Sequence, residues 1–401
     1  MSDTFKFNTR DSWETYFNKQ PHRHLTIWEL VNYPLPKVAV NYSKKPSHSY
    51  NKKWSKLSEL RSFSDFNAQY IRPMLGPAIY ELETRCTHDI LVKRLEEAER
   101  SSIQREGDFD NYCTEWFKYI INAIIDAIAK PVGVEANITW NKRPLPRAGG
   151  GSFYTDSWIH IDGKVKTGHG SPTDTEYDTM DGTRIEPSLL PPGKPIVCVV
   201  GEDKLSRNWS SSVAEPYLDK GAQQLLTGEK WEFAPLRQVA TYSSWGQTRW
   251  NIIFTDVEVV IGRAYKVQET EAAFLIYDLE LDAPDDYLGL EIASIQWAQA
   301  ATPDRLSALE GIMACIVLSF QSRYRQLVRY DQLHRLNRWF SIEENGRTYY
   351  QHSLTRTITV HRPDGVELES REFLLTDNSN NILQQNAIIL LTTVIGHKTW
   401  K

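Results

Sequence analysis

Two side chains with catalytic potential stand two positions apart at the end of a predicted strand. The run Pro195–Val200 is rich in β-branched residues, as is typical of a central strand covered on both faces, and it leads into Gly201-Glu202-Asp203-Lys204. Because strand side chains alternate between faces, we expect Glu202 and Lys204 to point one way and Asp203 the other. A carboxylate and an ammonium group would then share one edge of the sheet.

Such a pair suits the hydrolysis of a phosphodiester bond. That reaction needs a hard cation held by oxygen ligands, Mg²⁺ or Mn²⁺, and a positive group near the attacking water and the charge that develops on phosphate. One carboxylate binds Mg²⁺ poorly, so a second is expected from a neighbouring strand. Asp156 is placed for this role, since it stands at the head of the strand predicted within Phe153–Ile161.

A second ligand later in the chain stays open as an alternative. The separation of Asp156 from Glu202 exceeds what a simple hairpin needs, so Asp178 or Asp181 would serve if the strand lay later. Asp156 is preferred because strand-like residues follow it, whereas Asp178 and Asp181 lie among turn-forming residues in a long predicted loop, 163–193.

A predicted helix follows the carboxylates along the chain. Pro235 is suited to its first turn and Gly246 to its end. Gln238 and Tyr242 are four residues apart on this helix, so both side chains project from one face. We expect them to reach over the sheet edge and to position a water molecule or a phosphate.

This order of motifs resembles the PD-(D/E)XK nuclease superfamily, which has the restriction-endonuclease-like fold, and in particular its branch with a Gln-x-x-x-Tyr helix. Within it, the segments 201–209, 235–242 and 247–256 look like a group of uncharacterised fungal nuclease-like proteins. The resemblance covers roughly residues 110 to 330. It departs from the motif at Thr155, which stands where the motif has proline.

The resemblance implies a role for each matching residue. Asp156 and Glu202 would be metal ligands, and Lys204 would be a catalytic base or an electrostatic stabiliser; Gln238 and Tyr242 would support them. Superfamily members often add a carboxylate from the first core helix. Glu115 is the candidate for this further metal ligand, and Asp126 on the same helix competes with it.

The elements around these residues predict an α/β fold with a mixed central sheet flanked by helices. We expect a helix over 110–129, then strands over 134–140, 153–161 and 195–200, the helix 235–246, and strands over 249–254 and 258–265. A further long helix is expected to be capped by Thr302, with Pro303 at its first position. Around the nuclease-like domain, 110–330, lie an N-terminal helical extension, 1–109, with a basic segment at 37–61, and a C-terminal β-hairpin extension, 331–401.

Length, net charge and cysteine content indicate the kind of cellular compartment in which the protein works. The chain has 401 residues, a net charge of −5 and four cysteines without C-x-x-C spacing, and it shows no signal-like or membrane-length apolar segment. We therefore expect an intracellular protein, cytoplasmic or nuclear. The net charge by itself predicts no nucleic-acid partner; it is the order of motifs and the resemblance that imply a divalent-metal-dependent nuclease acting on DNA or RNA. The alternative is a catalytically inactive nuclease-fold scaffold, and the basic segment is read as a solubilising arm rather than a nucleic-acid grip.

Overall fold

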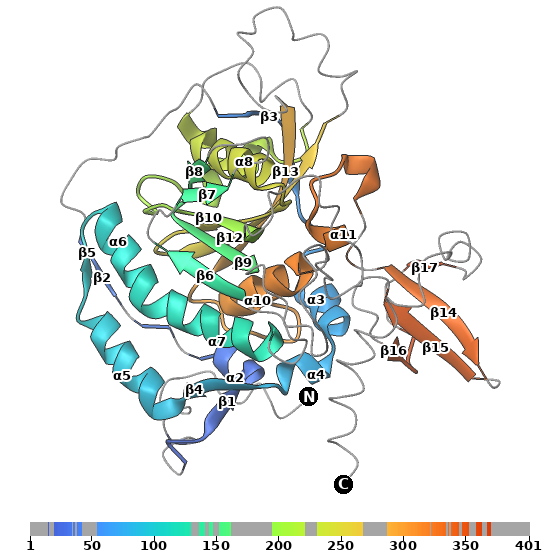
Figure 1. Cartoon of the computed structure of the whole chain (residues 1–401), viewed down its shortest axis with the longest axis horizontal. Helices are drawn as coiled ribbons and strands as arrows, with labels where there is room; N and C mark the ends of the chain where they lie inside the picture. The colour runs from blue at the N-terminus through green and yellow to red at the C-terminus, as the bar shows by residue number, and fades with distance from the viewer. Residues whose placement is uncertain are drawn as a thin grey trace, which may run out of the picture.

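A seven-stranded mixed sheet forms the centre of the protein, seen in a computed structural model (Figure 1). The structure describes residues 20–33, 54–129, 136–140, 152–161, 195–220, 231–267 and 287–320, with shorter segments elsewhere up to residue 369. The strand order is β3-β13-β12-β11-β10-β9-β6. In chain order these strands are β3 (Lys56–Ser62), β6 (Ala136–Trp140), β9 (Ser157–Ile161), β10 (Ile196–Asp203), β11 (Trp250–Phe254), β12 (Glu258–Lys266) and β13 (Tyr287–Gln296).

Strand β10 occupies an interior position in this sheet, as its apolar run predicts. It pairs antiparallel with β9 and parallel with β11, and helix α8 (Ala234–Gly246) makes the crossover between the two parallel strands. Every residue of β10 is buried. The predicted strands 134–140, 195–200, 249–254 and 258–265 and the predicted 235–246 helix are confirmed, and the α/β class with a mixed sheet is confirmed with them. The strand predicted over 153–161 is instead two strands in different sheets, β8 (Ser152–Tyr154) and β9, with Asp156 in a bend between them.

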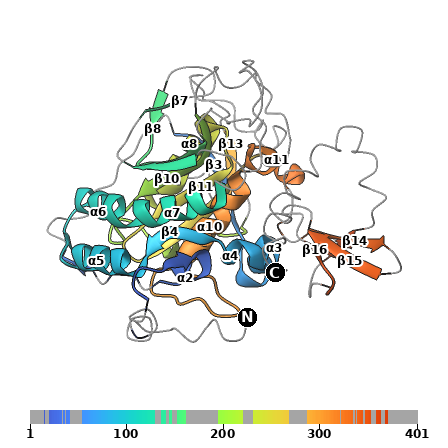
Figure 2. The ribbon, with the colours of Figure 1, turned by 60° about the horizontal axis from the view of Figure 1, so that its bottom comes forward.

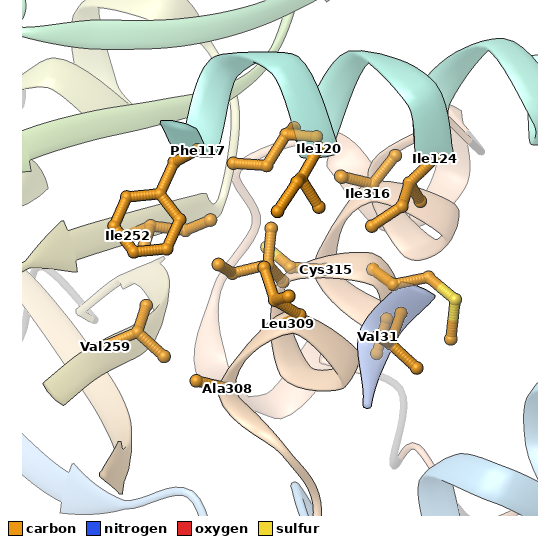
Figure 3. Packing of buried hydrophobic residues seen from close by; sticks show 14 of the residues in the cluster. Val31, Phe117, Ile120, Ile124, Ile252, Val259, Ala308, Leu309, Cys315 and Ile316 are labelled. Carbon is orange, nitrogen blue, oxygen red and sulfur yellow. The ribbon is translucent and has the colours of Figure 1, made fainter. Parts of the chain in front are cut away.

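Helices cover both faces of the sheet. Helices α7 (Lys118–Ala129) and α10 (Ala308–Ser319) lie on one face and α8 lies on the other (Figure 2). On the first face, Ile120 and Ile124 of α7 point toward Leu309 and Ile316 of α10 (Figure 3). A separate apolar cluster under α8 includes Leu236, Val239 and Ile253. Strand β10 packs on its α8 side through Val197 and Val200, which form a third cluster with Trp158 and Tyr242, and its other apolar side chains belong to the first core.

The N-terminal part of the chain is built into the same body. Its elements are β1 (His24–Thr26), α2 (Ile27–Val31), β2 (Ala39–Val40), α3 (Ala68–Leu75), α4 (Pro77–Tyr80), β4 (Glu83–Thr87), α5 (His88–Glu99) and β5 (Ser102–Ile103). The interpretation of the basic segment 37–61 as a solubilising arm is wrong for residues 56–61. There β3 pairs parallel with β13, and its Leu57 and Leu60 are buried in the α8 core.

Helix α10 begins later than its predicted cap. Its N-cap is Ser307, whose side chain accepts a hydrogen bond from the Glu310 N–H, and Glu310 completes a capping box. Thr302 and Arg305 instead form a short turn closed by backbone hydrogen bonds. The prediction that Thr302 caps this helix is wrong, because the later capping box is the stronger start signal.

The expected 110–129 helix starts earlier and has a local irregularity. It consists of α6 (Glu106–Tyr112), the π-helical turn η1 (Cys113–Phe117) and α7.

The smaller elements are β7 (Pro144–Pro146), β8 (Ser152–Tyr154), η3 (Ser211–Val213), η4 (Glu215–Tyr217), η6 (Trp231–Phe233), α11 (Ser322–Arg325) and η8 (Tyr330–Gln332). The C-terminal extension contains a four-stranded sheet of β14 (Arg338–Glu344), β15 (Arg347–His352), β16 (Ile358–Thr359) and β17 (Glu367–Glu369). None of the described helices has the length and apolar composition that a bilayer crossing requires.

Candidate metal site at the end of strand β10

The pairing of β9 with β10 brings two carboxylates together. In the register of the two strands Gly201 lies opposite Ser157, so Asp156 and Glu202 flank the paired residues. A Cβ atom at position 201 would lie 2.0 Å from the Ser157 Oγ, so glycine permits this close approach. The backbone N–H of Asp203 donates to Asp156 Oδ2 at 3.0 Å and fixes the Asp156 carboxylate at the strand end.

Glu202 is a buried carboxylate, with 2% of its surface exposed. Its Oε1 accepts a hydrogen bond from Lys204 Nζ, while its Oε2 has no hydrogen-bond partner among the described residues. Burial raises the pKa of Glu202 to about 8; the Asp156 carboxylate adds to the rise and the Lys204 ammonium opposes it. Two buried acceptor groups side by side are stable only if a proton or a cation joins them.

Lys204 bridges the sheet edge and helix α6. Its Nζ donates to Glu202, to Glu106 Oε1 at 3.1 Å and to the Asp203 carbonyl at 3.1 Å. Burial alone would lower the pKa of Lys204, but the charges of Glu202, Glu106 and Asp156 more than offset it and hold that pKa above its ordinary value. The ammonium therefore stays charged at neutral pH.

Helix α8 brings its two predicted residues over the same carboxylates. Gln238 and Tyr242 are both buried, and Gln238 Nε2 donates to the Tyr242 hydroxyl at 2.7 Å. Burial, together with the charge of Glu202, raises the pKa of Tyr242 above its ordinary value. Its hydroxyl stays protonated, and because it accepts from Gln238, its own hydrogen is left to donate elsewhere.

Asp203 faces the other side of the sheet, as strand alternation predicts. Its Oδ2 accepts a 2.7 Å hydrogen bond from the indole of Trp140 at the end of β6. Burial, followed by the charges of Asp156 and Asp110, raises the pKa of Asp203 well above its ordinary value. Asp203 is fully buried, and its Oδ1 has no hydrogen-bond partner among the described residues.

The two helix carboxylates singled out in the sequence lie in other surroundings. Glu115 is exposed, and its backbone carbonyl accepts from Arg94 at 3.0 Å. Asp126 pairs with Arg85 at 2.7 Å. Within the described segments, neither residue forms a hydrogen bond or an ion pair with Glu202 or Lys204. Asp178 and Asp181 lie outside the described residues.

Helix α6 supplies the acidic residues that sequence reasoning missed. Glu106 contacts the Lys204 ammonium, and Asp110 lies close enough to Asp203 to raise its pKa. The two are four residues apart on α6, so they share one face of that helix. The sequence pattern predicts a helix that begins only at Asp110, so it leaves Glu106 outside the helix and gives no sign that the two residues share a face.

The donor set fits Mg²⁺ or Mn²⁺ better than a transition metal. Across the described segments, no group of three or more His, Cys, Asp or Glu side chains is arranged to hold an ion. Mg²⁺, however, keeps several of its water ligands and is commonly bound through one or two carboxylates together with substrate phosphates. Asp156 and Glu202 supply two carboxylates, and Glu202 Oε2 accepts no hydrogen bond from the described residues.

Comparison with known proteins identifies no relative of this chain. No protein-family model, curated protein or solved structure matches this chain. The site is therefore interpreted from its own geometry.

Proposed function

We propose that this protein is a divalent-metal-dependent nuclease of the PD-(D/E)XK type, which hydrolyses phosphodiester bonds in DNA or RNA. The observation that carries the proposal is the meeting of the Asp156 and Glu202 carboxylates with the Lys204 ammonium at one strand end. The order of strand, strand, helix and strand from β9 to β11 agrees with it. So does the position of Gln238 and Tyr242 above the carboxylates.

Each side chain has a task that its surroundings permit. A bound Mg²⁺ would polarise the phosphate and lower the pKa of an attacking water. Asp156 and Glu202 would hold the cation. Lys204 is charged at neutral pH, so it would stabilise the negative charge on the transition state rather than accept a proton. Tyr242 would donate its hydroxyl hydrogen to the water or to a phosphate oxygen.

Substrate would approach from the Lys204 side of the cluster. The Lys204 side chain is 14% exposed and that of Glu106 is 39% exposed, whereas Glu202 is 3% exposed. A phosphate reaching Lys204 would meet Glu106 first, and this contact must loosen for the ammonium to engage the phosphate. Glu106 thus belongs to the entrance and Glu202 to the base of the site.

The test is cleavage of labelled single- and double-stranded DNA and RNA with Mg²⁺, with Mn²⁺ and with EDTA. Wild type should cleave at least one substrate only when metal is present. Lys204→Ala should lose most activity, since removing one preorganised charge costs roughly 10²- to 10³-fold in rate. Lys93→Ala, an exposed lysine on α5, is the matched control. Metal-independent cleavage, or equal rates for wild type and Lys204→Ala, would remove the proposal.

A second candidate is a catalytically inactive scaffold that keeps the same fold. The observation that favours it is that Lys204 is already engaged by two carboxylates and that Asp156 and Glu202 are more than nine-tenths buried. Calorimetric titration with Mg²⁺ separates the two functions. A nuclease should bind Mg²⁺ in wild type and lose that binding in Asp156→Asn, whereas a scaffold should show no binding that depends on Asp156.

A further inference from the structure

The ammonium group of Lys204 uses all of its hydrogen-bond donors within the protein. A lysine ammonium carries three N–H donors and no acceptor. Those of Lys204 donate to Glu202 Oε1, to Glu106 Oε1 and to the Asp203 carbonyl. A phosphate oxygen can therefore bind this ammonium only if it takes the place of one of these three acceptors.

The three acceptors differ in their surroundings, and Glu106 is the one that can be displaced. The Asp203 carbonyl belongs to the backbone of β10. The Glu202 side chain is buried, so separating its carboxylate from the ammonium would leave a buried charge without compensation. The Glu106 side chain is 39% exposed. Water solvates an exposed carboxylate well, so its ion pair with Lys204 stabilises little and is readily exchanged for another anion.

Helix α6 keeps its start when the Glu106 side chain turns away from Lys204. Asp108 Oδ2 accepts from the backbone N–H groups of Gln104 and Arg105, at 3.1 Å each. The next residue, Gly107, is exposed, and a Cβ atom at this position would meet nothing within 4 Å beyond its own helix turn. Open space thus borders Glu106, and the contacts that hold the helix start do not involve its carboxylate.

We propose that Glu106 marks the subsite of a substrate phosphate: a phosphate oxygen takes the position of Glu106 Oε1, 3.1 Å from Lys204 Nζ, while Lys204 keeps its contact with Glu202. This inference rests on the proposed nuclease function. Carboxylate and phosphate oxygens both accept charge-assisted hydrogen bonds from an ammonium, so the two anions compete for one N–H. Glu106 therefore weakens phosphate binding at this subsite, and the substrate has to displace it.

The experiment measures binding in EDTA, so that no metal-dependent cleavage takes place. Short fluorescein-labelled DNA and RNA, single- and double-stranded, are titrated with full-length wild type and Glu106→Gln, and binding is followed by fluorescence anisotropy. Glutamine keeps the length of the side chain but removes the charge that holds it to Lys204. Glu106→Gln should bind at least one probe roughly threefold or more tightly than wild type. Glu97→Gln, which removes the same charge from an exposed position on α5, is the matched control and should bind like wild type.

A double mutant separates competition for Lys204 from simple repulsion between negative charges. If Glu106 competes with phosphate for the ammonium, the gain from Glu106→Gln should disappear in a Lys204→Ala background. A gain that persists there undiminished would show that Glu106 only repels phosphate, and the subsite would be wrong. Calorimetric titration of Glu106→Gln with Mg²⁺ should match wild type. Loss of Mg²⁺ binding would make Glu106 a metal ligand and would overturn the subsite as well.

The possible outcomes separate this proposal from the nuclease proposal. If Glu106→Gln binds every probe like wild type, or if neither protein binds any probe, the phosphate subsite is wrong. The first of these results leaves the nuclease proposal standing, provided that Lys204→Ala still abolishes metal-dependent cleavage. Conversely, a gain that requires Lys204 in a protein that cleaves neither DNA nor RNA would support the phosphate subsite and refute the nuclease.

Discussion

Glu202 and Asp203 are neighbours in sequence with opposite surroundings. Glu202 lies against Lys204 and the α8 residues, whereas Asp203 is tied to Trp140 on the other side of β10. We expect Glu202→Gln to abolish Mg²⁺ binding in calorimetry, because it removes one of two carboxylate ligands. Asp203→Asn should leave that binding within a few-fold of wild type. If both variants lost Mg²⁺ binding equally, the metal would depend on carboxylates from both sides of β10. The assignment of Glu202 rather than Asp203 as the ligand would then be wrong.

The pKa of Glu202 gives a pH dependence with a definite sign. Burial raises this pKa to about 8, so near pH 7 a fraction of the metal-free protein carries a proton on Glu202 that Mg²⁺ must displace. Binding at pH 7 should therefore release protons, seen as a binding enthalpy that changes with the ionisation enthalpy of the buffer. Apparent affinity should rise with pH up to about 8 and then level off. Proton release that is absent at pH 7 would contradict this.

Most of the proposed site could be predicted from the sequence, because the side-chain periodicities of a strand and of a helix are enough to group its residues. Alternation in a strand puts Glu202 on the side of Lys204, and a four-residue spacing puts Gln238 above Tyr242. Glu106 and Asp110 could not be found in this way. Their helix, α6, is short and acidic, and its link to Lys204 and Asp203 exists only once the chain has folded.

At the scale of elements, the start of α10 shows which local signal dominates. Ser307 caps the helix and its hydroxyl donates to the Val31 carbonyl, whereas Thr302 lies in a turn. Ser307→Ala should therefore lower the free energy of unfolding by about 1 kcal/mol, the usual cost of losing an N-cap. Thr302→Ala should change it by less than about 0.5 kcal/mol. Urea unfolding of both variants checks this, and a larger loss for Thr302→Ala would reverse the assignment.

Strands β3 and β13 were not predicted, and the reason is physical. In β3, Leu57 and Leu60 are buried between charged neighbours such as Lys56 and Arg61, so the segment resembles a solvated arm in sequence. Arg61 is held within the fold by Glu59 and the Tyr265 hydroxyl. Such strands form because an adjacent strand of the sheet is available for pairing. That strand can be far away in sequence, so the local residue pattern does not predict the pairing.

At the scale of the whole molecule, the N-terminal residues and the region 110–330 depend on each other. Arg72 of α3 makes two hydrogen bonds to the Glu310 carboxylate of α10, and Tyr80 makes a third at 2.8 Å. Glu310 is fully buried, and Arg72 forms an ion pair with it at 2.7 Å. Breaking such a pair by removing one partner costs about 3–5 kcal/mol.

A shortened chain of residues 110–330 should consequently fail to fold cooperatively. It lacks β3, whose Leu57 and Leu60 each contribute roughly 1.5–3 kcal/mol by burial, and it leaves Glu310 without Arg72. These losses approach the whole stability of a typical domain, about 5–15 kcal/mol. Thermal unfolding followed by circular dichroism should show no sharp transition for 110–330 but a sharp one for 20–336, the control that keeps β3 and α3. A cooperative transition in 110–330 would mean that the nuclease-like region is a domain in its own right and that β3 is an accessory strand.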